Sequence, residues 1–471
     1  MTSTFAEIVL ALSIPLMVGV FFVMRPVPAA LVVALGAEMF LPEGPSFKLP
    51  FTPAFGKHTL PYMCILIACL LRYPGRVTKL PKEKWILLLV LLLVAGGVLT
   101  GLTNGESLVF GNEGQVFIPG LNIKDGFYMG ISHFVADFLP FYLGYALFRK
   151  REDFDELVTG LAIAGLVYIP FALVELRLSP QWHRWVYGYA QHDFVQTLRW
   201  GGYRPMVFMS HGLAVGQFFV AATFSLIILA KYRRSLVGLP LRFLIWAQFL
   251  VLVACKSTGS IVYALVGIPL LAWAKPKRQL LVAAVIAGIT LFYPLLRLSD
   301  VFPVTSILDA AQSVQSDRAD SLAFRFRNED ALLARTRERL FFGWGEYGRN
   351  MVRDERGGSI STFDGHWIIR LSVNGLVGFI ASFGPLLIPV FLVRRRLAAL
   401  DDAKTRLSLA GIAFTLTILT VDLLPNGLWA CYPYLIAGAL TRRLREAVAE
   451  QRAHEEAQFL ADSSLDARAS L

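Results

Sequence analysis

Charged residues are scarce in this sequence. Only 17% of its 471 residues are Asp, Glu, Lys or Arg, whereas 55% are hydrophobic, and the mean hydropathy is +0.56. A soluble chain of this length would fold into two or three domains with charged surfaces. The composition therefore excludes an ordinary soluble protein.

Patterns for several chemistries are also missing. The sequence has no glycine-rich phosphate-binding loop, no His-x-x-x-His zinc pattern and no convincing internal repeat of the kind found in many transporters. Its four cysteines show no pairing or metal-ligand spacing and suit small buried apolar positions. We therefore expect no metal ion and no cofactor.

Apolar residues instead fall into blocks of about 20, the length that crosses about 30 Å of hydrocarbon. These blocks predict an all-α polytopic membrane protein of about 12 or 13 transmembrane helices. Two of the spans are short enough to be tilted or re-entrant. The expected spans are 5–24, 27–42, 59–72, 85–102, 126–148, 154–176, 209–230, 241–255, 258–274, 280–296, 367–393, 407–423 and 427–441.

Basic clusters occupy every second loop of this arrangement, as at Arg394–Arg396 and Arg442–Arg445. The positive-inside rule places these loops in the cytoplasm, so the N-terminus lies outside and the C-terminus inside. The clusters explain most of the net charge of +11, and we expect no nucleic acid as a partner. The chain then divides into N-terminal transmembrane helices (1–176), an extracytoplasmic loop (177–208), transmembrane helices (209–296), a large extracytoplasmic loop with a short helix (297–365), C-terminal transmembrane helices (366–441) and a cytoplasmic tail (442–471).

The first extracytoplasmic loop is rich in aromatic and basic residues. Trp182 and Trp185 are typical of the aromatic belt at a membrane surface, although sugar rings also stack on such aromatics. Arg204 closes the loop directly before a span, and a basic residue on the outer side runs against the topological bias. We therefore expect a feature outside the membrane that favours Arg204.

The large loop predicts a helix that begins at Asp320 or Ser321 and runs to about residue 340. Arg325 and Glu329 lie four residues apart in it and can form an ion pair, the pattern of an ordinary surface helix. Glycines at 343 and 345 then permit a tight bend or a close approach of the backbone to a ligand.

Polar residues also lie within the expected spans. Arg370 and Asn374 are one turn apart, as are His133 and Asp137. Ionisable groups inside a membrane are costly and line a cavity or meet a partner. His133 and Asp137 are therefore interpreted either as a buried structural pair or as groups that handle substrate or protons, and Glu175 and Asp422 have the same alternatives.

Four motifs follow one another over roughly 203–379: Arg204-Pro205-x-x-Phe208, Lys256-Ser257-Thr258-Gly259-Ser260, Arg325 followed 18 residues later by Gly343-x-Gly345, and a polar pair before Gly375-x-x-Gly378. Each is common alone, but their order and spacing are fairly specific. Together they resemble the motifs of the O-antigen ligase and O-antigen polymerase superfamily of bacterial surface-polysaccharide assembly. Many members carry His-Asn about eleven residues before the last motif, whereas that count leads here to Asp364, with His366 two residues later.

The resemblance implies a metal-independent glycosyltransferase of the bacterial inner membrane. It would polymerise undecaprenyl-diphosphate-linked repeat units into O-antigen or exopolysaccharide on the outer face, with the N-terminus in the periplasm. The displaced polar motif favours a polymerase over a ligase. The expected partners are the undecaprenyl-diphosphate-linked oligosaccharide and the lipid bilayer, and a chain-length regulator is a further candidate.

Under this resemblance the outer-loop residues acquire roles. Planar guanidinium groups bind phosphate oxygens well and stabilise developing negative charge. The acceptor hydroxyl needs a base or an orienting acceptor, and which of several residues serves stays open. The expected diphosphate ligands are Arg204, Arg325, Arg327 and Lys256; the catalytic candidates are Arg325, Asp364, His366, Glu329 and Asp330; the saccharide contacts are Trp200, Tyr203 and Trp344.

Three alternatives remain. A ligase would transfer the finished glycan to a lipid A core or a protein. A flippase or transporter of lipid-linked saccharides should concentrate arginines inside its spans and contain helices broken by Gly or Pro. A non-catalytic scaffold protein is the third. The arginines that stand out here lie in two outer loops, which favours the enzyme.

Overall fold

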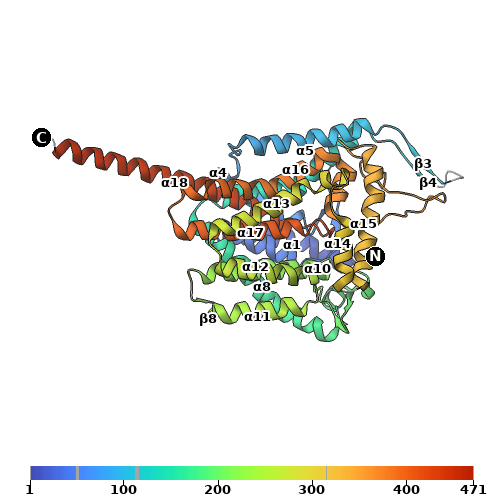
Figure 1. Ribbon diagram of the computed structural model, residues 1–471, viewed down its shortest axis with the longest axis horizontal. Coiled ribbons are helices and arrows are strands. Elements are labelled where there is room, and N and C mark those ends of the chain that lie inside the picture. The colour runs from blue at the N-terminus through green and yellow to red at the C-terminus, as the bar shows by residue number, and fades with distance from the viewer. Residues whose placement is uncertain (1, 49–51, 112–115, 315, 470–471) are drawn as a thin grey trace.

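The structure is a computed structural model that describes residues 2–48, 52–111, 116–314 and 316–469. It is almost entirely helical, and its strands, two or three residues long, form four small antiparallel hairpins. Most long helices lie side by side along one direction, whereas α15 crosses one end of the bundle (Figure 1).

The helices of the N-terminal half are α1 (Thr4–Val23), α2 (Pro26–Phe40), α3 (Leu60–Arg72), α4 (Pro74–Val77), α5 (Lys84–Thr103), α6 (Ile123–His133), the π-helix η1 (Phe134–Phe138), α7 (Leu139–Leu147), α8 (Arg151–Leu178), α9 (Trp182–Tyr187), the 3-10 helix η2 (Phe194–Thr197) and α10 (Gly212–Ala230). Those of the C-terminal half are α11 (Leu241–Ala254), α12 (Thr258–Trp273), α13 (Pro276–Leu298), α14 (Val304–Val314), α15 (Ser316–Arg337), α16 (His366–Arg396), the 3-10 helix η3 (Leu397–Ala399), α17 (Ala403–Val421) and α18 (Tyr432–Ala469). The hairpins pair β1 (Ser46–Phe47) with β2 (Phe55–Gly56), β3 (Leu108–Phe110) with β4 (Val116–Ile118), β5 (Leu198–Arg199) with β6 (Gly202–Tyr203), and β7 (Ser235–Leu236) with β8 (Leu239–Pro240).

Seven helices of the described chain are long and apolar enough to cross a membrane: α1, α5, α8, α10, α13, α16 and α17. Four shorter apolar helices, α2, α3, α11 and α12, accompany them. The predicted all-helical class is therefore confirmed, and the seven long apolar helices are consistent with a polytopic membrane protein. Each expected span coincides with helical structure, including 126–148, which is α6, η1 and α7 in succession.

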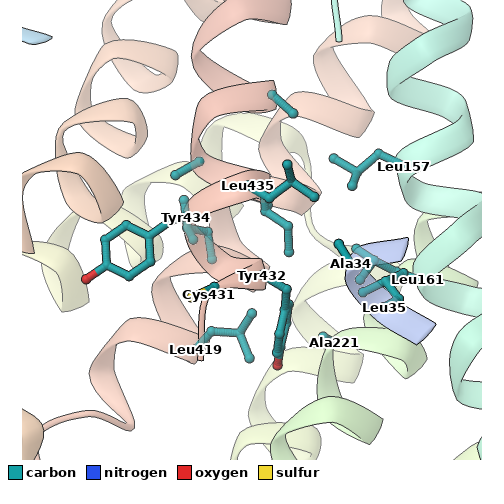
Figure 2. Close-up of a cluster of buried hydrophobic side chains, with 14 of the residues drawn as sticks. Ala34, Leu35, Leu157, Leu161, Ala221, Leu419, Cys431, Tyr432, Tyr434 and Leu435 are labelled. Atoms are coloured by element: carbon teal, nitrogen blue, oxygen red, sulfur yellow. The ribbon is translucent and has the colours of Figure 1, made fainter. Parts of the chain in front are cut away.

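The core is centred on α10. Every residue of α10 from Val215 to Leu229 is buried, whereas α1 leaves Leu12 and Leu16 largely exposed. A helix that is apolar all round belongs at the centre of a bundle, and an exposed apolar stripe on an outer helix suits lipid. Figure 2 shows one apolar cluster of this core, where side chains of α2, α8, α10, α17 and the start of α18 meet.

The large loop differs from its prediction. It contains two helices, α14 and α15, and α15 begins at Ser316, so Asp320 and Ser321 lie inside it instead of capping it. The predicted boundary between the last span and the tail is also crossed, because α18 continues without a break from Tyr432 to Ala469. Periodicity alone cannot locate these ends, since helix ends depend on tertiary contacts.

The loops gather at two opposite ends of the bundle. The N-terminus, α14, α15 and the β3–β4 hairpin lie at one end, and α4, the β7–β8 hairpin and the C-terminal part of α18 lie at the other (Figure 1). The expected alternation of the loops groups these segments in the same way.

Candidate functional site

A cavity of about 780 Å³ lies at the end of the bundle that carries α15. Its walls come from residues 192–211, the first turns of α10 and α12, α14 and α15, residues 363–364, and the turn 422–428 after α17. The cavity thus brings together Arg204, the Ser257–Ser260 turn and Arg325, which are more than 100 residues apart from first to last.

Arg204 is almost fully buried in the wall of this cavity. Its Nη2 donates to the Lys256 carbonyl at 3.1 Å, whereas its buried Nε has no partner in the described part of the chain. Burial and the neighbouring Arg199 lower the pKa of Arg204 to about 10, so the group stays charged at neutral pH. A buried cation held only by a carbonyl is costly, and an anion bound beside it would offset that cost.

Arg325 reaches from α15 to the turn after α17. Its Nη1 donates to the Pro425 carbonyl and lies 3.4 Å from Asn426 Oδ1. The predicted ion pair with Glu329 is wrong, because Glu329 instead binds Arg297, with Arg297 Nε 3.2 Å from Glu329 Oε2. Arg325 therefore keeps its charge facing the cavity, with neutral acceptors on one side.

Two carboxylates line the same cavity. The Oδ2 atom of Asp364 is buried and has no hydrogen-bond partner among the residues that the structure describes. Asp422, just beyond the last residue of α17, accepts a hydrogen bond from Asn426 Nδ2 at 2.9 Å. Burial raises the pKa of Asp422 to about 6, against the opposing effect of Asn426, Gln217 and Tyr263. Both groups can accept a hydrogen from a hydroxyl in the cavity.

His211 also lines the cavity but is a poor base. It caps α10, its Nδ1 accepting from the Leu213 backbone N–H at 3.0 Å, so its Nε2 carries the hydrogen and faces Gln196 Oε1 at 3.4 Å. Burial, with nearby positive charge, lowers the pKa of His211 to about 3. The ring is thus a neutral donor.

Glu329 and Asp330 lie elsewhere. Glu329 also accepts from the Tyr293 hydroxyl at 3.2 Å and from Trp367 Nε1 at 3.3 Å, and Asp330 accepts from Arg297 Nη2 at 2.8 Å. These contacts hold α15 against α13 and α16, and neither carboxylate lines the cavity. In the structure, both carboxylates are therefore part of the contacts between helices.

His366 likewise faces away from the cavity. Its Nε2 accepts from Arg370 Nε at 3.1 Å, and Arg370 Nη2 donates to Asp137 Oδ1 at 2.9 Å, while Arg370 Nη1 contacts His133. The void at this cluster measures about 10 Å³, room for about one water. His133, Asp137, Arg370 and Asn374 thus line one buried void beside the π-helix η1, and this void is too small to hold a sugar.

The remaining predicted residues lie around the site or outside it. Arg327 is exposed and does not line the cavity, and Trp344 is buried under the Arg335 guanidinium, 3.3 Å from its ring centre. The Lys256 ammonium packs against Gly202 in the β5–β6 hairpin. Trp200 is exposed at the turn of that hairpin, and the Tyr203 ring lies 6.2 Å from that of Phe194. The hairpin contributes Arg199 to the cavity and so stands at its rim.

The glycine motifs pack against each other. Gly375 has φ +66° and breaks α16, and the freed backbone is paired by the segment 340–345: Trp344 N–H donates to the Ser372 carbonyl at 2.9 Å, and Leu376 N–H to the Leu340 carbonyl at 2.8 Å. A Cβ on Gly375 would lie 2.2 Å from the Phe341 carbonyl oxygen. Of the two predicted uses of the Gly343 turn, the tight bend is therefore the observed one.

Sequence analysis missed two parts of the site's surroundings. Gln217, the one amide side chain in the apolar helix α10, lines the cavity, and its place in that run was the available signal. Near it lies a charged cluster of the buried Glu38 and Lys57 with the half-buried Glu43 and His58, in which Lys57 Nζ is 2.9 Å from Glu43 Oε1. No sequence motif pointed to these four residues.

Comparison with known proteins adds no assignment: no protein-family model matches the chain, and no curated protein matches it significantly.

Proposed function

We propose that this chain is a glycosyltransferase of the bacterial inner membrane that polymerises undecaprenyl-diphosphate-linked repeat units into O-antigen or exopolysaccharide. It would cross the membrane about 13 times, with the large cavity on the periplasmic face and the C-terminus in the cytoplasm. The proposal depends on one observation: Arg204, Arg325, Asp364 and Asp422 all line one cavity of about 780 Å³.

The two arginines suit the lipid diphosphate. Among the described residues the buried Nε of Arg204 has no hydrogen-bond partner, and Arg325 donates hydrogen bonds to neutral groups of the turn at 425–426. A diphosphate between them would satisfy both charges by charge-assisted hydrogen bonds. Arg199 adds a third positive group at the same wall. As the sugar–phosphate bond breaks, the charge that grows on the leaving diphosphate is held by fixed cations.

The carboxylates suit the acceptor sugar. The acceptor hydroxyl oxygen forms a bond to the anomeric carbon, the bond from that carbon to the diphosphate oxygen breaks, and the leaving diphosphate keeps the electron pair. The hydroxyl proton goes to a carboxylate, for which Asp364 and Asp422 are the groups placed in the cavity. Trp200 and Tyr203 at the rim would contact the saccharide, and the step needs no metal.

One observation favours the transporter alternative. The helix α16 is broken at Gly375, and Arg370 is paired with Asp137 between helices, features that transporters share. The break, however, is filled by residues 340–345, and the void at Arg370 has room for about one water. We therefore place transport second.

The test is complementation of a deletion strain of the host. Wild type, Arg204→Ala, Arg325→Ala and Asp364→Asn are expressed at matched membrane levels, and surface and lipid-linked glycans are analysed by gel and mass. The proposal expects single repeat units to accumulate in the deletion strain and long polymer to return only with wild type. Full-length polymer left unattached would indicate a ligase. Lipid-linked units trapped on the cytoplasmic face would indicate a flippase, and normal glycan with both arginine variants would refute the diphosphate site.

A further inference from the structure

A second, smaller cavity adjoins the first. It measures about 40 Å³, room for about two or three waters, and Gln217, Asp422 and Leu428 line both cavities. Gln217 is 7% exposed, and its Oε1 atom has no hydrogen-bond partner within the described residues. A buried amide oxygen without a partner, beside a void that the polar side chains of Asp422, Glu38 and Tyr432 also line, is a place where water can bind. Asp422 therefore faces the substrate cavity on one side and this small cavity, called the passage below, on the other.

The far end of this passage is acidic. Glu38, near the end of α2, lines the small cavity, and its Oε2 atom lies 3.4 Å from His58 Nδ1. The His58 side chain is 24% exposed and so is the point at which this cluster approaches solvent. Burial disfavours its charged form, but Glu38 and Glu43 outweigh burial and raise the pKa of His58 to about 10. Tyr432 lines the same cavity, and Figure 2 shows its ring directed away from that of Tyr434.

We propose that the small cavity carries the proton that Asp422 takes from the acceptor hydroxyl to Glu38 and His58. This inference rests on the proposed function. The Asp422 carboxylate accepts the hydroxyl proton as the new glycosidic bond forms, and water in the small cavity passes the proton to the Glu38 carboxylate. His58 releases its own proton to solvent and takes the one held by Glu38. Asp422 returns to its charged form, ready for the next turnover.

The passage is the route left open once substrate is bound. Asp422 is 4% exposed, and a lipid-linked sugar that fills the large cavity separates it from solvent on that side. The groups that face Asp422 include Tyr263, Gln217, Asn426, Arg325 and Tyr432. Those that face Glu38 include His58, Tyr62, Tyr168, Cys431 and Tyr432. Both carboxylates line the small cavity.

The test uses the purified full chain in lipid nanodiscs with the host's lipid-linked repeat unit, and compares wild type with Glu38→Gln. The relay predicts that Glu38→Gln lowers kcat at neutral pH by about tenfold or more with KM unchanged. Small proton-accepting buffers such as imidazole are expected to restore much of the loss, and the solvent deuterium effect is expected to increase. Glu338→Gln, which makes the same change at an exposed carboxylate, is expected to behave as wild type.

Buffer rescue separates a relay from a structural role, because a distorted site is not repaired by imidazole. Gln217→Leu is the second variant, used whether or not Glu38→Gln folds, and it should give the same rescuable loss by drying the passage. Wild-type transfer with unchanged rate, pH profile and buffer response in both variants would overturn the relay while the proposed function stands. Absence of transfer by wild type would overturn both.

Discussion

Arg325 and Arg327 lie two residues apart on α15, yet their surroundings differ. Arg325 lines the cavity and contacts the 425–426 turn, whereas Arg327 is exposed outside it. We predict that Arg325→Ala lowers kcat/KM for polymerisation by about 100- to 1,000-fold, the loss typical of removing one group that stabilises developing charge. Arg327→Ala should stay within about twofold of wild type, as for most surface changes. Equal losses in both variants would show that the charge of the loop matters and not the cavity.

The titration of Asp422 predicts a pH limit. A carboxyl whose pKa is raised to about 6 is protonated below that pH and cannot then accept a proton. The transfer rate should therefore fall as pH decreases through about 6, and Asp422→Asn should be inactive at every pH. The measurement is the pH profile of kcat in nanodiscs, with thermal unfolding followed at each pH to exclude denaturation. A low-pH limb that persists in an active Asp422→Asn protein would assign the titration to another group.

At the scale of elements, the decisive contact is the one between α16 and residues 340–345. A broken helix leaves backbone groups unpaired, which is costly within a bundle. The carbonyls and N–H groups of 340–345 pair the freed groups around Gly375 and so fix the route of the loop that follows α15. Glycine is needed there both for φ +66° and for the close approach of two backbones.

Substitution of Gly375 tests the stability of the fold and not the transfer reaction. Gly375→Ala places a methyl group 2.2 Å from the Phe341 carbonyl oxygen and imposes a left-handed conformation on alanine. We expect it to destabilise the fold by about 2 kcal/mol or more. Gly288→Ala in α13 is the matched control, because its Cβ would meet no atom within 4 Å, and it should be neutral or stabilising by up to about 1 kcal/mol. Thermal unfolding in detergent compares the two variants. Equal stability would contradict the close contact between Gly375 and residues 340–345.

At the scale of the whole molecule, the loops at the two ends of the bundle should face opposite sides of the membrane. All four cysteines are buried, so single introduced cysteines report on their own positions. A membrane-impermeant maleimide added to spheroplasts should label Ser313→Cys in α14 and leave Ser235→Cys in β7 unlabelled until the membrane is permeabilised. The reverse pattern would invert the proposed orientation.

Composition and periodicity were sufficient to predict the helical class and the approximate positions of the apolar helices, because both follow from local sequence. They could not place side chains in three dimensions. Asp364 and His366 are two residues apart, yet Asp364 lines the cavity and His366, which accepts from Arg370 one turn further along α16, does not. Glu329 pairs with Arg297, 32 residues earlier, and does not line the cavity either. Contacts between distant helices carry this information, and no local pattern encodes it.

The central claim is that the large cavity transfers a sugar chain from a lipid diphosphate. The most direct measurement incubates the purified protein in nanodiscs with the host's undecaprenyl-diphosphate-linked repeat unit and follows products by mass spectrometry. Our account predicts lipid-linked products that lengthen by whole repeat units, with release of undecaprenyl diphosphate, in wild type and not in Arg204→Ala or Arg325→Ala. Binding of the lipid without elongation by wild type, or equal elongation by the arginine variants, would contradict it.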